Sequence, residues 1–294
     1  MFARVALLCA LAACVAASGV SAESADRPRV TVIGDSILTA VLWNAEPTKV
    51  LSSGFDLRME IGVCRRLTGE SCPFEGKEVP TLLQVVQQLH ASGELAPTVV
   101  VEVGYNDPAP TFADAVEQSI DALLDAGVTR ILWVNLKEAE GQYPAMNRDL
   151  LAAARRHPEV RLVDWNTYSI NKWSWFQGDG KHLTYDGALA IAGLIHTQLL
   201  GALAKPLAVA PLPPARLGRP YSARLRITGG VRPYVLRVAR RHLPRGLHLL
   251  ANGRLYGTPR TAGVLRFLLD VRDAADDERQ LPLSLDVRGV PNGA

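Results

Sequence analysis

Cysteine is scarce in this sequence, and long uncharged apolar runs are scarcer still. The chain has 294 residues and 4 cysteines, of which Cys9 and Cys14 fall in its N-terminal segment. After that segment no stretch approaches the ~18 consecutive apolar residues of a membrane-spanning helix. We therefore expect no transmembrane segment in the mature chain. With 48% hydrophobic residues the chain can still bury a sizeable core, which excludes a globally disordered protein.

The N-terminal segment has the pattern of a secretory signal. A positive charge at Arg4 precedes an uncharged apolar run and small residues that end at Ala22, as at an A-x-A-like cleavage site. We expect residues 1–22 to be a signal peptide and the mature protein to be periplasmic or secreted. Two alternatives stay open: an uncleaved membrane anchor, and lipidation of Cys14, which ends the lipoprotein-box-like sequence LAAC.

Export would leave only Cys64 and Cys72 in the mature chain. Two cysteines in an oxidising compartment, 8 positions apart, predict a local disulfide loop. A metal site is disfavoured because two thiols without nearby His or Cys partners cannot supply four ligands. The oxidising setting also disfavours a nucleophilic cysteine. We expect no metal and no cofactor.

Charge is divided unevenly along the chain. Residues 1–204 hold 16 Lys and Arg against 23 Asp and Glu, whereas residues 205–294 hold 16 against 6. This asymmetry predicts two modules, joined by the Pro-rich stretch 205–214, which should be extended and stiff. The basic module suits contact with an anionic glycan or envelope surface, and a solvated Arg-rich face is the plainer alternative. Export and the lack of interleaved aromatic residues disfavour nucleic acid.

Strand-like and helix-like segments alternate through residues 29–204. Such alternation predicts a parallel sheet covered by helices on both faces, with ligands at the carboxyl ends of the strands. Strands are expected at 29–34, 56–62, 98–104, 130–136 and 160–165, and helices from 36 onward and at 81–90, 111–127, 146–157 and 184–204.

Residues 215–289 have a different sequence pattern. Short strand candidates are separated by Gly/Pro turns, including an Asn-Gly hairpin signal at Gly253, and this rhythm predicts a small antiparallel sandwich. The module has no cysteine, so its stability should rest on the sandwich core alone. The strand candidates are 221–227, 234–239, 265–273 and 281–289.

Three polar stretches fall where a doubly wound sheet gathers its ligand-binding residues. VIGDSIL places Ser36 just past the first strand, and VEVGYND places Asn106 just past the third. GDGKHLT places Asp179 and His182 before the last helix. Because the carboxyl ends of parallel strands share one edge, we expect these side chains to converge there.

Together these residue types suit nucleophilic catalysis. A serine hydroxyl is a weak nucleophile unless a positioned imidazole takes its proton. His182 can be that base if Asp179 orients its other ring nitrogen and stabilises the imidazolium. The resulting oxyanion needs hydrogen-bond donors, which the Ser36 N–H and the Asn106 side-chain amide can supply.

Each stretch has a plainer interpretation when taken alone. A strand-end serine is often a helix N-cap, and an isolated histidine is often a satisfied polar residue. A metal site from Asp179, His182 and Asp186 is disfavoured because their spacing suits no common ligand set. An α/β-hydrolase would need G-x-S-x-G around its nucleophile, and GDSIL lacks the second glycine.

Residues 29 to about 203 resemble an SGNH (GDSL-type) hydrolase domain. GDS at 34–36 is similar to the first sequence block of that family, GYND at 104–107 to the third, and DGKH at 179–182 to the fifth. The resemblance implies a flavodoxin-like three-layer α/β/α sandwich with a parallel sheet. It further implies ester hydrolysis or acyl transfer through an acyl-serine intermediate.

The same resemblance implies roles for individual residues. Ser36, His182 and Asp179 would form the triad, with oxyanion donors from Ser36, from a second-block backbone N–H and from Asn106. The second block departs from the family pattern. Gly62 matches it by residue type, whereas Cys64 lies nearer the usual glycine position counted from the strand end. A disulfide between Cys64 and Cys72 would hold this loop beside the site.

The expected activity is that of an exported serine esterase acting on a small ester or an O-acylated envelope glycan. Two alternatives stay open: acyl transfer onto a polysaccharide with the same residues, and a non-catalytic surface-binding protein on a vestigial SGNH scaffold. Trp173, Trp175 and Phe176 could wall an acyl or sugar site or could simply pack their loop. The tail module resembles bacterial Ig-like domains, which implies an all-β Ig-like sandwich that acts as a spacer or adhesion unit.

Overall fold

The computed structural model describes residues 27–238 and 243–289. The expected signal peptide over residues 1–22 and the alternative lipidation site at Cys14 lie outside the described residues, so both stay predictions.

Five parallel strands form the sheet of the first module, and their order is β2-β1-β3-β4-β5. The middle strands β1 and β3 are buried almost throughout, as expected when helices cover both faces. The parallel α/β sheet predicted from the sequence is therefore confirmed. Its strands are β1 (Arg29–Gly34), β2 (Asp56–Ile61), β3 (Thr98–Glu102), β4 (Arg130–Val134) and β5 (Val160–Val163).

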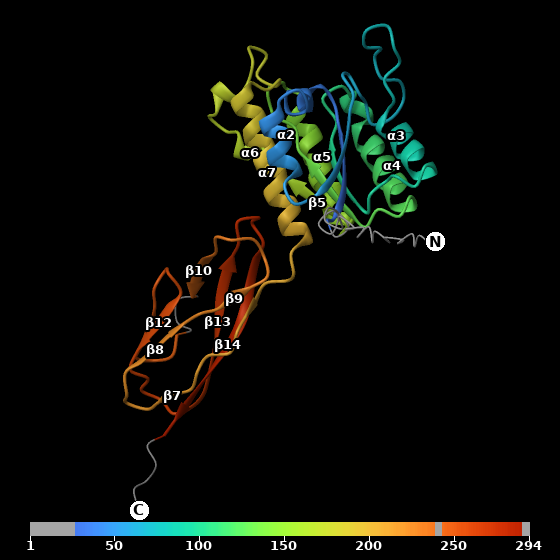
Figure 1. The fold of residues 1–294 in the computed structure, drawn as a ribbon. Helices are drawn as coiled ribbons and strands as arrows, with labels where there is room; N and C mark the ends of the chain where they lie inside the picture. The colour runs from blue at the N-terminus through green and yellow to red at the C-terminus, as the bar shows by residue number, and fades with distance from the viewer. Residues whose placement is uncertain (1–26, 239–242, 290–294) are drawn as a thin grey trace, which may run out of the picture.

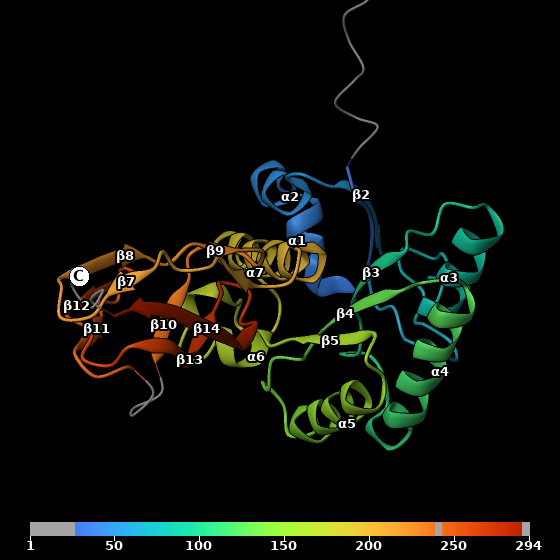
Figure 2. The ribbon, with the colours of Figure 1, turned by 90° about the horizontal axis from the view of Figure 1, so that it is seen from below.

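Helices cover the sheet in two layers (Figures 1 and 2). Helices α1, α2 and α7 contact one another on one face, and α3, α4 and α5 lie on the other. The helices are α1 (Thr39–Leu42), α2 (Ala45–Ser52), α3 (Leu82–Ala91), α4 (Phe112–Asp125), α5 (Tyr143–Arg156), α6 (Trp165–Tyr168) and α7 (Tyr185–Leu203), with 3-10 turns η1 (Ser36–Leu38), η2 (Ala109–Thr111) and η3 (Trp173–Trp175).

The strand order places a topological switch point between β1 and β3. From β1 the chain moves outward to β2, and then returns to form β3 on the other side of β1. Connections that diverge in this way leave a crevice beyond the carboxyl ends of the two strands. Ser36 and Asn106 follow these two strands directly, so the topology brings them to the same edge.

The segment after Ser36 differs from the expected single helix. It forms the turn η1, the short helix α1 and then α2, which the sequence did not indicate. Pro47 is the third residue of α2, where its missing N–H costs no intrahelical hydrogen bond. Pro47 and Leu51 are buried, so α2 is held by packing as well as by local propensity.

Helix α7 is long and apolar enough, by length and composition, to cross a membrane. In this fold it packs on α2 and on the sheet strands β4 and β5. Its apolar residues, among them Ile191, Ile195 and Leu199, are buried in the core of the first module. That packing accounts for the composition of the helix.

Residues 215–289 form β-rich sheets with a hydrophobic core of their own. The sheet orders are β10-β13-β14-β7 and β11-β12-β8. The predicted Asn-Gly hairpin joins β11 to β12, and Gly253 adopts the expected positive φ of 80°. The strands are β7 (Ala215–Arg216), β8 (Tyr221–Arg224), β9 (Ile227–Thr228), β10 (Val235–Val238), β11 (Leu247–Leu249), β12 (Arg254–Gly257), β13 (Gly263–Arg272) and β14 (Glu278–Arg288).

The Pro-rich stretch 205–214 is not a free spacer over its whole length. Its residues Ala208–Val209 form β6, which pairs with β9 of the β-rich module. The Gly230 N–H also donates to the carbonyl oxygen of Lys205 at 2.9 Å. The first half of this stretch is therefore docked on the second module.

Candidate active site

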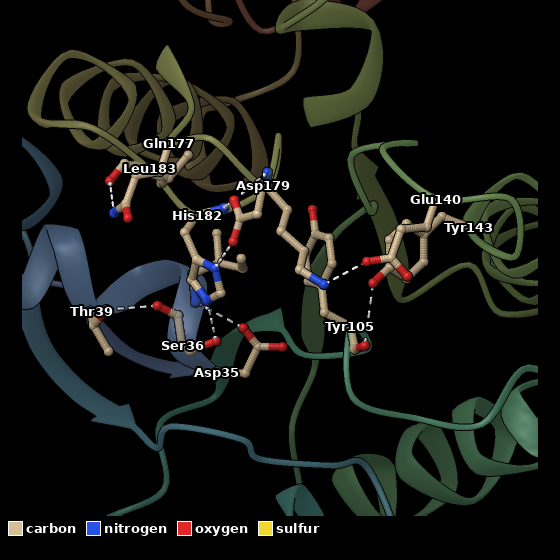
Figure 3. Close-up of polar contacts among 12 residues, drawn as sticks. Asp35, Ser36, Thr39, Tyr105, Glu140, Tyr143, Gln177, Asp179, His182 and Leu183 are labelled. Carbon is tan, nitrogen blue, oxygen red and sulfur yellow. Dashed lines mark hydrogen bonds and ion pairs between the residues drawn. The ribbon is translucent and has the colours of Figure 1, made fainter. Parts of the chain in front are cut away.

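Ser36 and His182 meet at the carboxyl edge of the sheet (Figure 3). Ser36 Oγ lies 3.0 Å from His182 Nε2, and the two residues are 146 positions apart in the sequence. On the other side of the ring, His182 Nδ1 lies 2.5 Å from Asp179 Oδ2. The structure thus brings together the serine, the imidazole and the carboxylate in the order that a charge relay needs.

The charge on Asp179 determines which ring nitrogen of His182 carries a proton. Burial acts to raise the pKa of its carboxyl, but hydrogen bonds from the His182 ring and from two backbone N–H groups outweigh it and lower the pKa to about 2. Asp179 is then ionised and can only accept hydrogen bonds. His182 Nδ1 must therefore carry the proton, which leaves Nε2 to accept one from the Ser36 hydroxyl.

The loop that carries Asp179 and His182 is closed by its own hydrogen bonds. Asp179 Oδ1 accepts from the N–H groups of Lys181 and His182, each at 3.0 Å. The Gln177 N–H donates to the carbonyl oxygen of His182 at 2.7 Å. Thr184 then caps α7, because its Oγ1 accepts from the Gly187 N–H at 3.3 Å. The D-x-x-H spacing is thus held rigidly between η3 and α7.

Lys181 ties this loop to the opposite wall of the site. Its Nζ lies 2.6 Å from a carboxylate oxygen of Glu140, and the pKa of Lys181 is raised chiefly by that contact. Figure 3 shows Glu140 and Tyr143 beside the relay. Nothing local in the sequence indicates that Glu140 faces Lys181, because the two residues are 41 positions apart.

The two candidates for the second-block donor have different surroundings. The Gly62 N–H donates to the carbonyl oxygen of Gly34 at 3.0 Å, so it extends the β1–β2 ladder and is already engaged. Residues 62–65 form a turn in which the Arg65 N–H donates to the Gly62 carbonyl at 3.1 Å. Cys64, the third residue of that turn, has φ 67°, a conformation usually left to glycine. Because the Gly62 N–H is already engaged, Cys64 stays as the candidate for the second-block donor.

The predicted disulfide between Cys64 and Cys72 is present. It holds the second-block loop at the residue with the unusual backbone conformation. A non-glycine residue in this region is strained, so a covalent tie at Cys64 helps to keep the turn in place.

Arg65, the last residue of this turn, is almost fully buried, at 3% exposure. Its Nε and Nη1 have no hydrogen-bond partner among the described residues, and burial lowers the pKa of the guanidinium to about 10. A Cβ atom on Gly62 would stand 2.6 Å from Arg65 Nη2. A side chain at residue 62 would therefore force the buried Arg65 guanidinium to shift, a packing constraint that the sequence did not indicate.

Asn106 lies at the site with its side-chain amide directed at neighbouring loops. Its Nδ2 donates to the carbonyl oxygen of Arg65 at 3.1 Å and to Asp35 Oδ2 at 3.4 Å. The longer of these bonds is weak enough to be exchanged for a hydrogen bond to a substrate oxyanion.

The second-block and third-block loops are joined by further hydrogen bonds. Arg66 Nε donates to the carbonyl oxygen of Asn106 at 2.8 Å. Asp107 accepts from the Leu67 N–H through both carboxylate oxygens, at 3.0 and 3.2 Å. Burial raises the pKa of Asp107 to about 7. Asp107 therefore holds the neighbouring loop as well as its own turn.

Two buried acids lie behind the serine. Asp35 caps η1 by accepting from the Ile37 N–H at 3.0 Å, and burial raises the pKa of its carboxyl to about 6. Glu102 lies next to it, since one of its carboxylate oxygens is 3.4 Å from the Asp35 nitrogen. Burial and the neighbouring Asp35 raise the pKa of Glu102. A single acid in the apolar strand TVVVE was the signal that could have indicated this pair.

The aromatic residues before the D-x-x-H loop divide into two groups. Trp175 stacks on Trp165 with ring centroids 5.8 Å apart, and Phe176 is 7% exposed, so both pack the loop. Trp173 is 75% exposed, and it lines a cavity of about 580 Å³ together with Phe176, Lys137 and Asp179. Trp173 is therefore the exposed aromatic wall of this cavity, and Phe176 contributes to its lining from a buried position. Over residues 27–238 and 243–289, no cluster of three or more His, Cys, Asp or Glu side chains could hold a metal ion.

No family model matches the chain. A Staphylococcus aureus (strain MSSA476) protein provisionally named an O-acetyltransferase is 30% identical over 161 residues, which are 53% of this chain and 25% of that protein. The peptidoglycan O-acetyltransferase OatA of Listeria monocytogenes is 32% identical over 99 residues, which are 33% of this chain and 15% of that protein. Thus the chain spans about a quarter or less of the length of these curated relatives.

These sequence matches accompany a sheet of the predicted topology, with the three motif blocks at the expected strand ends. The first module therefore has the SGNH-like parallel α/β fold that the sequence predicts. Among solved structures, the C-terminal catalytic domain of Streptococcus pneumoniae OatA is 16% identical, with a TM-score of 0.43 over 58% of this chain and 92% of that one. Both of these curated relatives carry O-acetyltransferase names. The narrower Ig-like assignment of the β-rich module stays a prediction.

Proposed function

We propose that this chain is an extracytoplasmic SGNH enzyme that transfers acyl groups on cell-envelope glycans through an acyl-Ser36 intermediate. The observation that carries the proposal is the relay itself, in which Ser36 Oγ and Asp179 Oδ2 flank the two nitrogens of His182 at 3.0 and 2.5 Å. A strand-end serine that only capped a helix would need no such partner. Asp35, not Ser36, supplies the cap of η1.

In the first half-reaction Ser36 Oγ attacks the carbonyl carbon of the acyl donor while His182 Nε2 takes the hydroxyl proton. Asp179 keeps the ring oriented and stabilises the imidazolium that forms. When the tetrahedral intermediate collapses, the C–O bond to the donor breaks. The leaving alcohol then receives the proton from His182, and the acyl group stays on Ser36.

Three donors can stabilise the oxyanion in this scheme: the backbone N–H groups of Ser36 and Cys64 and the side chain of Asn106. The Asn106 amide would exchange its 3.4 Å bond to Asp35 for one to the oxyanion. The Asn106→Ala variant is expected to lose on the order of 10² to 10³ in kcat, measured with a chromogenic acetyl ester. A loss confined to KM would contradict this role.

In the second half-reaction His182 Nε2 takes the proton of an acceptor hydroxyl as that oxygen attacks the acyl-serine carbonyl. When the C–O bond to Ser36 breaks, His182 gives this proton to Ser36 Oγ. A sugar hydroxyl as acceptor gives O-acylation of a glycan, which the names of the sequence relatives support. Water as acceptor gives hydrolysis. Hydrolysis is the second candidate because the side chains of His182 and Asp179 are 36% and 41% exposed, so water reaches the site.

A glycan substrate is supported by the surface beside the relay. The exposed Trp173 offers a ring face to a sugar, and Glu138 and Gln177 add polar groups along the same cavity of about 580 Å³. Ligand sites of this volume commonly combine an aromatic wall with a few polar anchors. Asp179 belongs to the same lining, so a glycan bound there would lie next to the relay.

The test of the chemistry uses p-nitrophenyl acetate with the full chain and its Ser36→Ala variant. Nitrophenol release is expected from the wild type and not from the variant, while both unfold at the same temperature. Turnover by Ser36→Ala at the wild-type rate would refute the acyl-serine mechanism.

The test of the acceptor adds a soluble peptidoglycan fragment to the same reaction. If the enzyme is a transferase, mass spectrometry detects an acetylated fragment and the yield depends on Ser36. If only acetate appears at every fragment concentration, the enzyme is a hydrolase and the transfer proposal fails.

A further inference from the structure

In the β-rich module all acidic residues lie on one sheet or its connecting turn, whereas arginines occur on both larger sheets. From Gly187 to Leu269 the sequence contains no Asp or Glu, and every acid of the module lies between Asp270 and Asp286, on β13, β14 and their connecting turn. There the arginines are neutralised locally. Arg272, Arg279 and Arg288 each pair with an aspartate two or four residues away.

The arginines on and beside β8 have no such partner. Arg224, Arg226 and Arg232 are exposed, and none of them makes an ion pair within residues 27–238 and 243–289. Arg254, on the adjacent strand β12, lies directly across from Arg224 and pairs with no acid in that part of the chain either. Figure 1 shows β8 and β12 side by side on one flank of the module. This flank therefore carries uncompensated positive charge.

These arginines surround a hollow in the surface. Arg224, Arg226 and Arg232 line a cavity of about 550 Å³ together with Tyr234 and Asn252. The lining includes no carboxylate. The Arg232 guanidinium lies 5.6 Å from the centroid of the Tyr234 ring, so the aromatic face and the cation are held at the same wall.

We propose that this arginine-lined cavity and the adjoining face of β8 and β12 bind an acidic polysaccharide. The planar guanidinium fork matches a carboxylate with two parallel hydrogen bonds. Tyr234 offers a ring on which a sugar can stack, and the Asn252 amide can bond to hydroxyl groups. A cavity of this size suits one or a few sugar units.

A nucleic acid fits the same surface less well. Binding of single strands relies on a groove with several aromatic rings on which successive bases stack. Here Tyr234 is the one aromatic residue of the cavity lining. The proposal concerns binding alone, so it holds whether or not Ser36 performs chemistry.

The test measures binding of the full chain to polygalacturonate at low salt, with dextran as a neutral polymer of similar flexibility. The Arg224→Gln/Arg226→Gln/Arg232→Gln variant is expected to bind at least about tenfold more weakly, since three exposed charge contacts are lost. The Arg272→Gln/Arg279→Gln/Arg288→Gln variant removes the same charge from the ion-paired sheet and is the matched control. It is expected to bind within about twofold of the wild type.

If both triple variants lost the same binding affinity for polygalacturonate, net charge alone would explain the loss, and the proposal would be overturned. It would also be overturned by dextran binding as strong as that of polygalacturonate, or by tighter binding of single-stranded DNA or phosphatidylglycerol vesicles at the same salt. The Ser36→Ala variant must bind polygalacturonate as the wild type does. The binding result is then independent of whether the acyl-serine mechanism is correct. Unfolding temperatures of both triple variants establish that each is folded.

Discussion

Arg65 packs against Gly62 so closely that a Cβ atom on residue 62 would stand 2.6 Å from Nη2 of the guanidinium. The same atom would also lie 2.8 Å from Val79 Cγ1. The second-block turn therefore packs on a buried cation, and any side chain at residue 62 would have to displace it.

The Gly62→Ala variant is expected to shift this turn and lose about 1–3 kcal/mol of unfolding free energy, as overpacking of a close contact does. Esterase activity should fall with it, because Cys64 lies in the displaced turn. The Gly141→Ala variant is a matched control, since nothing lies within 4 Å of its added Cβ. Urea unfolding and ester turnover check both, and equal behaviour of the two variants would contradict the packing argument.

Cys64 provides a test of the turn conformation itself. The Cys64→Ala/Cys72→Ala variant removes the disulfide and leaves a non-glycine residue at φ 67°, so the turn is expected to relax and kcat to fall. The Cys64→Gly/Cys72→Ala variant lacks the same disulfide but adopts this φ freely. It should therefore recover activity relative to the alanine pair. If the glycine variant is no more active, the backbone conformation at residue 64 does not matter to the reaction.

Asp179 is expected to be needed for the proton relay and much less for folding. The Asp179→Asn variant should lower kcat by on the order of 10³ to 10⁴, because an amide neither fixes the His182 tautomer nor stabilises the imidazolium. Asp186→Asn, a nearby carboxylate in the first turn of α7, is the control and should keep full activity.

The pH dependence of stability at Asp179 follows from the sign of its shift. Its pKa in the folded protein, about 2, lies below the ordinary value of 3.8. The stabilisation is therefore present above pH ~4 and is lost as pH falls toward 2. It should be small, because the side chain is 41% exposed.

Ionisation of Asp107 should change the stability of the fold in the direction opposite to that of Asp179. Its pKa in the folded protein is about 7, raised by burial from 3.8, so the fold favours the protonated carboxyl. That contribution is full below pH ~4 and is lost as pH rises through 7, by up to about 4 kcal/mol. Asp107→Asn cannot ionise yet keeps an acceptor for the Leu67 N–H. Urea unfolding at pH 5 and pH 8 should show a smaller loss in the variant than in the wild type, and equal losses would refute the assignment.

The sequence was sufficient for the parallel sheet and for the convergence of Ser36, His182 and Asp179. Alternating strands and helices leave few topologies, and all of them bring strand ends to one edge. The D-x-x-H spacing could be interpreted locally because the loop of residues 176–183 is closed by its own hydrogen bonds.

The residues that hold the site loops in place could not be predicted, because their roles depend on contacts between loops that are distant in the sequence. Whether the Gly62 N–H is free depends on the register between β1 and β2. In the observed register this N–H donates to the Gly34 carbonyl oxygen and so extends the ladder between the two strands. Arginine is rarely buried without a partner, so composition alone would have placed Arg65 on the surface. In the second module, β11 was missed because a three-residue strand beside Gly and Pro has the pattern of a turn.

The separation of 146 positions between Ser36 and His182 has a consequence for timing. The serine lies just past the first strand of the domain, and it has no base until the loop before α7 docks against the sheet. While the chain is unfolded, Ser36 therefore carries only an unactivated hydroxyl. In the proposed mechanism reactivity appears only once that loop has docked, so the order of the chain couples activity to completion of the fold.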